Sequence, residues 1–171
     1  EGAVRPLANL CASQKDDIDL VVTVVQALAN LSEHEECRPR MVQEGAVQPL
    51  VALCLKSGDA EILERAASTL LNLALVDSNR ILLVQLGSVV PLVQLFTKTK
   101  NERVLLNSAQ ALANLSLDDG SKQAILQQGG ITALIKVLRH FDHNDDLIVH
   151  ATHILSNLSA LKGCHDSLVE G

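Results

Sequence analysis

The sequence predicts an all-α fold, a right-handed α-solenoid of about four repeats with three helices in each repeat. Two short sequence markers recur together about every 42 residues. Of the 171 residues 47% are hydrophobic, but only two are Phe and none is Trp or Tyr. Leu, Val, Ile and Ala must therefore fill the core, which favours closely packed helices over a β-sandwich.

The first marker is a glycine that opens a short run of mostly small and apolar residues ending in leucine. Its glycines are spaced by 43, 42 and 42 residues, and Gly171 follows 42 residues later. The second marker is an asparagine followed by leucine and then by serine or alanine, and it keeps the same period. Two markers in register over the whole chain indicate a stack of structural repeats. The glycine-led copies are 2–7, 45–50, 87–92 and 129–134, and the asparagine-led copies are 30–32, 72–74, 114–116 and 157–159.

Each repeat is predicted to contain a short, a medium and a long helix. The short segment 79–84 ends at Gly87, where a glycine can take the left-handed conformation that terminates a helix. Three prolines then fall in the first turn of the medium helices, where a missing backbone N–H does no harm. The long helix of the second repeat runs roughly over 61–74. None of these helices can bury its apolar face alone, so the repeats must stack on one another. The prolines are Pro6, Pro49 and Pro91.

The Gly-Ala/Ser-Val-x-Pro-Leu start of the medium helix and the Ala-Leu-Ala-Asn-Leu-Ser end of the long helix resemble the armadillo repeat family, which includes β-catenin and importin-α. HEAT arrays, the nearest alternative, normally have two helices per repeat, so the short extra helix favours the armadillo family. We expect one armadillo-repeat domain over 1–171, with a partial repeat at 1–32 that holds the second and third helices. Full repeats are expected at 33–75, 76–117 and 118–160, and the first helix of a further repeat at 161–171. Because a natural solenoid needs polar caps, we also expect the natural protein to continue beyond both ends.

The resemblance implies that the long helices line the concave side of the stack. Residues four, seven and eleven positions before each asparagine share its helical face. All sixteen residues of these four columns are polar, whereas the leucines between them are apolar, so each long helix is predicted to have one solvated face and one packed face. The columns are Asn30, Gln26, Thr23 and Asp19; Asn72, Ser68, Arg65 and Glu61; Asn114, Gln110, Asn107 and Arg103; and Asn157, His153, His150 and Asp146.

The four asparagines, here called the asparagine ladder, suit the binding of an extended peptide. A carboxamide both donates and accepts hydrogen bonds, so it can pair with the N–H and C=O of a passing backbone. Neighbouring helices lie about 8–10 Å apart and a strand advances about 3.3 Å per residue, so the ladder would hold a peptide every two to three residues. In the family that the chain resembles, the equivalent asparagines bind extended peptides in this way. The alternative is structural: each asparagine fixes the end of its own helix or bonds to the loop of its neighbour. The predicted peptide-binding residues are Asn30, Asn72, Asn114, Asn157, Gln26, Ser68, Gln110, His153, Arg65, Asn107 and Arg103.

These features predict a non-enzymatic scaffold or adaptor that binds an extended segment of a protein partner. The alternative is a structural or regulatory spacer in a larger protein, packed on the neighbouring repeats or domains of the full-length chain. No Ser-His-Asp order, Gly-rich phosphate loop or nucleophile signature is present in the sequence. We therefore expect no catalytic site and no cofactor.

The side chains of the four columns indicate which kinds of peptide the groove would not bind. In importin-α a tryptophan four residues before the asparagine receives lysine side chains, whereas this chain has Gln26, Ser68, Gln110 and His153 at that position. Without an aromatic ring there is no cation–π contact, which disfavours binding of nuclear localisation signals. The columns also mix acidic and basic residues, unlike the strongly basic groove of β-catenin, so a uniformly charged ligand is disfavoured.

Charge and cysteine usage give the remaining expectations. Fourteen basic and twenty acidic residues leave a formal net charge of -6, which disfavours a nucleic-acid partner. No apolar run is long enough to span a bilayer, so we expect no direct membrane insertion. The four cysteines show no CxxC or other metal-ligand spacing, and we expect a reducing, intracellular compartment, the cytoplasm, with the nucleus left open. Cys11 and Cys54 share a repeat position with Phe96 and Leu138, so both are predicted to be core residues.

One local cluster raises the possibility of a metal site. His150 and His153 lie one turn apart on the predicted long helix, with His143 and Asp146 on or near the loop before it. The simpler interpretation, which we adopt, is a polar loop followed by two groove-facing residues. Micromolar zinc is therefore expected to leave the melting temperature unchanged in a thermal scan, and a rise in that temperature would contradict the interpretation.

Overall fold

The structure, a computed structural model, describes residues 2–13 and 17–161. Within these ranges it consists of α-helices and one short 3-10 helix, with no strand, and the predicted all-α solenoid is confirmed. The further helix expected at 161–171 lies outside the described residues, apart from Leu161. The elements are α1 (Val4–Ser13), α2 (Ile18–Glu33), the 3-10 helix η1 (Glu35–Cys37), α3 (Arg38–Gln43), α4 (Val47–Lys56), α5 (Ala60–Ala74), α6 (Asp77–Gln85), α7 (Val89–Lys98), α8 (Glu102–Leu115), α9 (Asp119–Gln127), α10 (Gly130–His140) and α11 (Asp145–Ser159).

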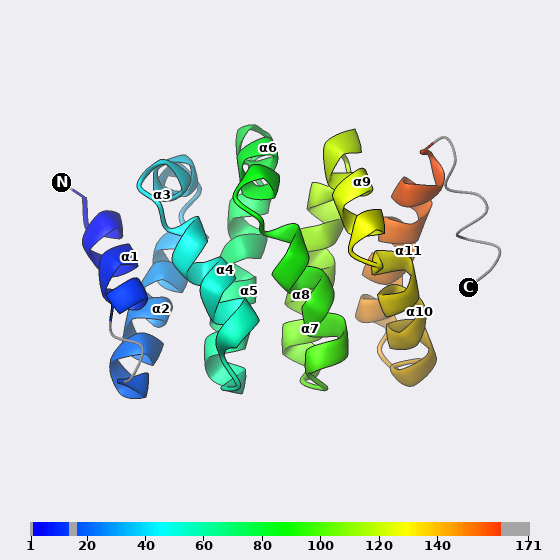
Figure 1. Cartoon of the computed structure of the whole chain (residues 1–171), viewed down its shortest axis with the longest axis horizontal. Coiled ribbons are helices and arrows are strands. Elements are labelled where there is room, and N and C mark those ends of the chain that lie inside the picture. The colour runs from blue at the N-terminus through cyan, green and yellow to red at the C-terminus, as the bar shows by residue number, and fades with distance from the viewer. Residues whose placement is uncertain (1, 14–16, 162–171) are drawn as a thin grey trace.

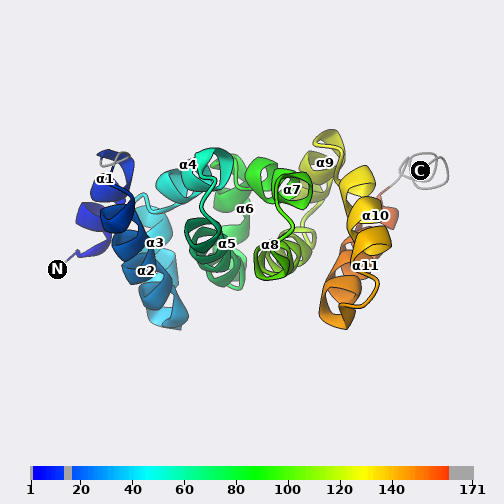
Figure 2. The same cartoon turned by 90° about the horizontal axis from the view of Figure 1, so that it is seen from below.

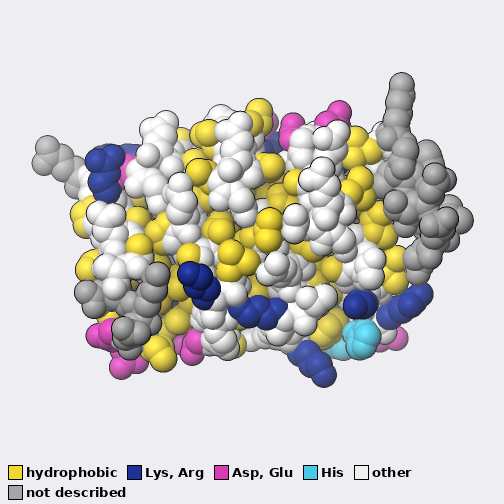
Figure 3. Space-filling view, viewed as in Figure 1, with side chains coloured by type: hydrophobic (Ala, Val, Ile, Leu, Met, Phe, Trp, Pro, Cys, Tyr) yellow, Lys and Arg dark blue, Asp and Glu magenta, His cyan; other side chains and the backbone are white. Residues whose placement is uncertain are grey.

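The repeats follow one another along the long axis of the molecule, from α1 and α2 at one end to α10 and α11 at the other (Figure 1). The medium helices α1, α4, α7 and α10 form one layer, and the long helices α2, α5, α8 and α11 form the other (Figure 2). On the face seen in Figure 3 hydrophobic side chains are scattered over the whole surface, and most of the basic side chains lie in its lower half. No single helix in the described ranges is long and apolar enough to cross a membrane, although α6 and α7 together, bent by 76° at their junction, reach that length and hydropathy.

Glycines end the short helices as the sequence predicts. Gly45, Gly87 and Gly129 have φ values of 87°, 82° and 72°, in the left-handed region. After α6 the N–H of Gly87 donates to the carbonyl of Val84 at 2.9 Å, and the N–H of Ser88 donates to that of Leu83 at 3.0 Å. This pair of bonds is the Schellman motif, which satisfies the last carbonyls of a helix and turns the chain. The prolines of α1, α4 and α7 are the third residues of those helices, within the predicted first turn.

A side-chain cap begins every long helix. The residue before each helix is Asp or Asn, and its side-chain oxygen accepts hydrogen bonds from backbone N–H groups of the first turn. The cap fixes the first residue of each long helix. Residues at the same distance after the cap therefore face the same way in all four long helices. The four capping residues are Asp17, Asp59, Asn101 and Asn144.

Aliphatic side chains join one repeat to the next. Helix α5 packs against both α2 and α8, and α11 packs against α8. Leu28, Leu70 and Leu112, at one position of three successive long helices, are all buried. The predicted core positions Cys11, Cys54 and Phe96 are buried too. Burial raises the pKa of the Cys11 thiol to about 11 and that of Cys54 to about 12, so both stay protonated at neutral pH and act as small apolar residues.

Basic side chains hold the carbonyl ends of several helices. Arg38 donates to the carbonyls of Ser32 and Glu33, at the end of α2, at 2.8 and 3.1 Å. Arg80 donates to the carbonyl of Ala74, at the end of α5, at 3.2 Å. The Lys98 ammonium crosses to the preceding repeat and donates to the carbonyls of Cys54 and Leu55 in the last turn of α4. Cations at helix C-termini are stabilising because free carbonyls and the helix dipole both attract positive charge.

Replacement of Gly87 by Ala is expected to lower the free energy of unfolding by about 1–2 kcal/mol, because a Cβ atom disfavours the left-handed conformation. Lack of space is not the reason, since an added Cβ would meet no heavy atom within 4 Å. Gly58→Ala is the matched control, because Gly58 has no positive φ and an equally open Cβ position. The control should leave stability unchanged or raise it by about 0.4–1 kcal/mol. Urea unfolding followed by circular dichroism measures both, and equal effects would contradict the argument.

Candidate functional site

The long helices α2, α5, α8 and α11 line the concave side of the arch, the lower side in Figure 2. All sixteen residues of the four predicted columns are exposed or partly exposed, and none is buried. The solvated face of each long helix is therefore the one predicted by counting back four, seven and eleven residues from its asparagine. Of the leucines between the columns, six are buried and two, Leu31 and Leu155, are partly buried. The buried ones are Leu28, Leu70, Leu73, Leu112, Leu115 and Leu158.

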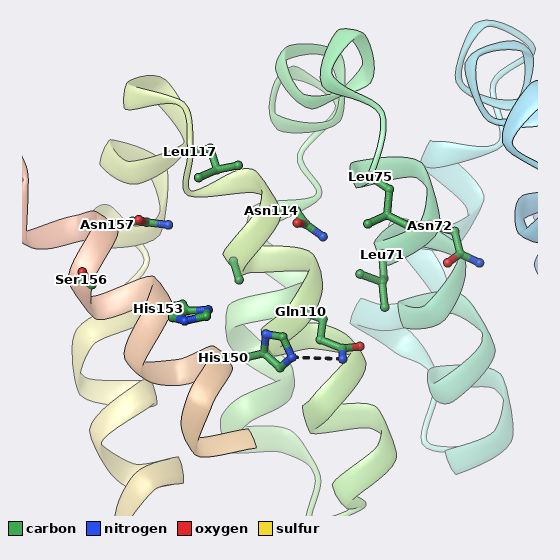
Figure 4. A pocket seen from close by; sticks show the side chains of 11 residues that line it. Leu71, Asn72, Leu75, Gln110, Asn114, Leu117, His150, His153, Ser156 and Asn157 are labelled. Atoms are coloured by element: carbon green, nitrogen blue, oxygen red, sulfur yellow. Dashed lines mark hydrogen bonds between the residues drawn. The ribbon is translucent and has the colours of Figure 1, made fainter. Parts of the chain in front are cut away.

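A pocket of about 620 Å³ opens on this face between α5, α8 and α11 (Figure 4), and we call it the central pocket. Three members of the asparagine ladder line it, and each comes from a different long helix. Two other predicted site residues, Gln110 and His153, line it as well. The eleven lining residues are Leu71, Asn72, Leu75, Gln110, Ala113, Asn114, Leu117, His150, His153, Ser156 and Asn157.

Six predicted site residues lie outside the central pocket, and most of those are engaged within the protein. On α2, Gln26 Nε2 donates to Asn30 Oδ1 at 2.7 Å. On α8, the Asn107 amide donates to the backbone carbonyl of Glu64 at 3.3 Å. The six are Asn30, Gln26, Ser68, Arg65, Asn107 and Arg103.

The two central arginines of the concave face are paired with carboxylates. Arg65 lies 2.8 Å from Glu61, one turn earlier on α5. Arg103 of α8 lies 3.3 Å from Glu64 of α5 and is 80% exposed, so solvent screens this pair. The mixed charge predicted for the concave face is therefore arranged as local ion pairs, which do not create a strong field of either sign.

The ladder asparagines differ in their hydrogen bonds. Asn72 Nδ2 donates to Ser32 Oγ at 2.9 Å, and Asn157 Nδ2 donates to Ser116 Oγ at 2.8 Å. Each bond joins a long helix to the end of the long helix in the preceding repeat. Within the described ranges the Asn114 side chain forms no hydrogen bond, because Ala74 stands where the other repeats have serine. Asn72 and Asn157 therefore have a structural role, which differs from the predicted alternative because the bond goes to a serine side chain at the end of the preceding long helix.

Apolar residues of the central pocket are the part of the site that sequence reasoning missed. Leu75 and Leu117 are 47% and 57% exposed, although most leucines of the described residues are buried or half-buried. Each stands three residues after a ladder asparagine: Leu75 is the residue that caps the end of α5, and Leu117 lies in the turn just after α8. The predicted columns extended only toward the N-terminus of each helix, so these two leucines were not included. The equivalent residues of the outer repeats are Glu33 and Ala160, which makes the apolar surface a feature of the two middle repeats.

A histidine lies at the lower end of the central pocket in Figure 4. His150 Nε2 is 3.2 Å from Gln110 Nε2, and His153 stands one turn further along α11. Partial burial lowers the pKa of His150 below its ordinary value, and neighbouring His153 lowers it further, while Asp146 opposes both effects. At neutral pH His150 is therefore uncharged, and its Nε2 can accept a hydrogen bond from the Gln110 amide.

The loop before α11 contacts the preceding repeat. His143 Nε2 lies 3.3 Å from Glu102 Oε1, and the Asn144 amide donates to Glu102 Oε2 at 2.7 Å. These bonds lower the pKa of Glu102. Among residues 2–13 and 17–161, no three His, Cys, Asp or Glu side chains are grouped so that they could hold a metal ion. The polar-loop interpretation agrees with these contacts.

Comparisons with known proteins agree on the type of repeat. A family model of the armadillo/β-catenin-like repeat matches residues 34–75 and 77–117. Computationally designed armadillo repeat proteins for modular peptide recognition are 25% identical, with a TM-score of 0.87, and the match covers 99% of this chain and 70% of theirs. A designed armadillo repeat protein in complex with the peptide (KR)4 is 26% identical, with a TM-score of 0.78, over 92% of this chain and 64% of that one.

A natural protein has the same fold. A structure from work on the interaction between cadherin and β-catenin matches with a TM-score of 0.84 and 23% identity. The match covers 96% of this chain but only 32% of that one, and at this identity it shows the fold alone. Comparison with curated protein sequences finds no significant match.

His150 should titrate below its ordinary pKa of 6.5 when its ring signals are followed by NMR from pH 8 to pH 5. His153→Gln should raise the pKa of His150, because it removes a neighbouring positive charge, and Asp146→Asn should lower it. Because the folded state favours the neutral ring, protonation opposes folding, and this effect should reduce the free energy of unfolding as the pH falls below about 6.5. If the pKa of His150 is the same in both variants as in the wild-type protein, the placement of the three side chains is contradicted.

Proposed function

We propose, since this chain is an armadillo-repeat protein, that it is a non-enzymatic scaffold that binds an extended segment of a partner protein along its concave face. The observation that carries the proposal is the central pocket, where asparagines from three consecutive long helices meet. The likeness of this chain to designed armadillo repeat proteins for modular peptide recognition also supports the proposed peptide binding. The geometry requires no cofactor for this function.

The asparagines retain the groups that a backbone needs. Each carboxamide has two donor hydrogens and an acceptor oxygen with two lone pairs. The bond from Asn72 to Ser32, or from Asn157 to Ser116, uses one donor hydrogen. One N–H and the whole of Oδ1 stay available for the C=O and N–H of a peptide. The structural role of these asparagines is thus compatible with peptide binding.

The surroundings of the asparagines favour a segment with aliphatic or uncharged side chains over a run of basic residues. Leu71, Leu75 and Leu117 supply apolar surface in the pocket, and His150 is uncharged at neutral pH. A designed armadillo protein binds the alternating basic peptide (KR)4. The four columns here contain no Trp, Tyr or Phe ring for cation–π contacts with such a ligand, and their arginines and carboxylates form local ion pairs that do not attract a run of basic residues.

A second function has one observation in its favour. Because Asn72 and Asn157 already join neighbouring repeats, the ladder also stabilises the stack, as a structural spacer within a longer protein requires. In that case the concave face would be covered by other parts of the same protein. The three buried or half-buried cysteines that are free in the described ranges support a reducing intracellular location for either function.

The double variant Asn72→Ala/Asn114→Ala should weaken peptide binding by about 1–3 kcal/mol, because two hydrogen-bonding groups are lost from the groove. The probes are peptides selected on the protein from a randomised dodecapeptide display library, with affinities measured by calorimetry. Asn114→Ala alone is the cleaner variant, since its side chain has no hydrogen bond in the described part of the chain. Asn9→Ala, an exposed asparagine on α1, is the matched control and should leave the affinity unchanged.

Two outcomes would contradict the proposal that peptides bind along the concave face. Unchanged affinity in Asn114→Ala, with a wild-type circular dichroism spectrum, would show that the selected peptides bind elsewhere. Failure to select any peptide, together with protection of the concave face from hydrogen exchange in a longer form of the protein, would favour the spacer.

A further inference from the structure

We propose that Ser32 and Ser116 are positioning residues that hold the carboxamides of Asn72 and Asn157 in one orientation. Ala74, which has no hydroxyl, leaves the Asn114 carboxamide free to exchange the positions of its oxygen and nitrogen. The consequence for binding rests on the proposed function, because the orientation of a carboxamide matters to a ligand only if the groove receives a peptide backbone. The orientation itself is a property of the free protein.

Each serine links an asparagine to the end of the neighbouring helix through two hydrogen bonds. Ser32 Oγ donates to the carbonyl of Ala29 at 2.6 Å and accepts from Asn72 Nδ2 at 2.9 Å. Ser116 Oγ donates to the carbonyl of Ala113 at 2.8 Å and accepts from Asn157 Nδ2 at 2.8 Å. Both serines have an exposed fraction of 0%, so water does not compete for these bonds.

The chemistry of the serine decides which end of the carboxamide faces it. A backbone carbonyl carries no proton, so the serine hydroxyl must supply the proton for its bond to Ala29 or Ala113. A hydroxyl has only one proton, and its oxygen is then left as an acceptor. Only the nitrogen of an asparagine can satisfy that acceptor, so Oδ1 must turn to the other side. In Figure 4 the nitrogen of Asn157 lies toward α8, the long helix of the preceding repeat.

The third repeat contains the natural comparison. Ala74 lies 40 residues before Asn114, the same separation as between Ser32 and Asn72. The backbone is held alike at both places, since Arg38 donates to the carbonyl of Ser32 and Arg80 donates to the carbonyl of Ala74. The hydroxyl is therefore the feature that Asn114 lacks. Without it, neither end of the Asn114 carboxamide is preferred by the neighbouring helix.

The proposal predicts a groove with two fixed positions and one adaptable position between them. At Asn72 and Asn157, Oδ1 and the second N–H face the groove before a ligand arrives, so less conformational freedom is lost on binding. At Asn114 the ligand selects the orientation. Asn72 and Asn157 would set the register of a bound peptide backbone, and the carboxamide of Asn114 would adjust to that backbone.

The free protein provides the first test, with no peptide present. Hydrogen exchange of the side-chain amides, measured by NMR, should be slower for Asn72 and Asn157 than for Asn114. Ser116→Ala should remove this protection at Asn157 and leave Asn72 protected. Ala74→Ser should create it at Asn114, because the backbone there already matches that of Ser32. Equal exchange at all three asparagines, or no change at Asn114 in Ala74→Ser, would overturn the proposal.

Peptide affinity provides the second test, with the dodecapeptides selected on the wild-type protein. Ser116→Ala should weaken binding and Ala74→Ser should strengthen it, each by about two- to tenfold, the range of one hydrogen bond. Ser108→Ala is the matched control: Ser108 is also buried on α8 and donates to its own helix, at the carbonyl of Val104. It should alter stability alone.

The outcomes separate the two proposals. If Ser116→Ala behaves like Ser108→Ala, with lower stability and unchanged affinity, the serine is merely structural and the positioning role is wrong. If no dodecapeptide binds the wild-type protein, the proposed function fails together with the binding role of the serines. Amide exchange in the free protein still decides in that case whether the serines orient the asparagines.

Discussion

Burial of aliphatic side chains between successive long helices is the interaction on which the rest of this structure depends. A single repeat cannot cover its own apolar face, and the chain has almost no aromatic residues that could increase the area buried per contact. Leu28, Leu70 and Leu112 are buried because a neighbouring repeat lies against them. The stack is thus both the source of stability and the reason that four polar faces line up along one side.

The groove follows from this stacking and from the way the long helices begin. Because an Asp or Asn cap precedes each long helix, equivalent residues on α5, α8 and α11 point the same way. Asn72, Asn114 and Asn157 consequently meet at one pocket. A carboxamide has more hydrogen-bonding capacity than one contact uses, so the same residue can join two repeats and still offer groups to a ligand. Structural and binding roles are therefore compatible at these positions.

Much of the fold and part of the site could be predicted from the sequence. The ends of the short helices at Gly45, Gly87 and Gly129 and the solvated face of the long helices both follow from local rules of helix geometry. The bond from Asn72 to Ser32 and the ion pair of Arg103 with Glu64 could not be predicted in the same way. They join residues about 40 positions apart, and their distances depend on how far one repeat is shifted and rotated against the next.

The sequence by itself determined the period, the three helices of each repeat and the polar column of each long helix. Those features depend on spacing along one chain segment, where 3.6 residues complete a helical turn whatever the neighbours do. Only the tertiary structure decided that Leu75 and Leu117 remain exposed in the central pocket, and that Asn72 and Asn157 bond to a serine of the preceding repeat while Asn114 has no such partner among the described residues. These outcomes depend on the distance between helices of different repeats, which arises from packing the whole stack at once.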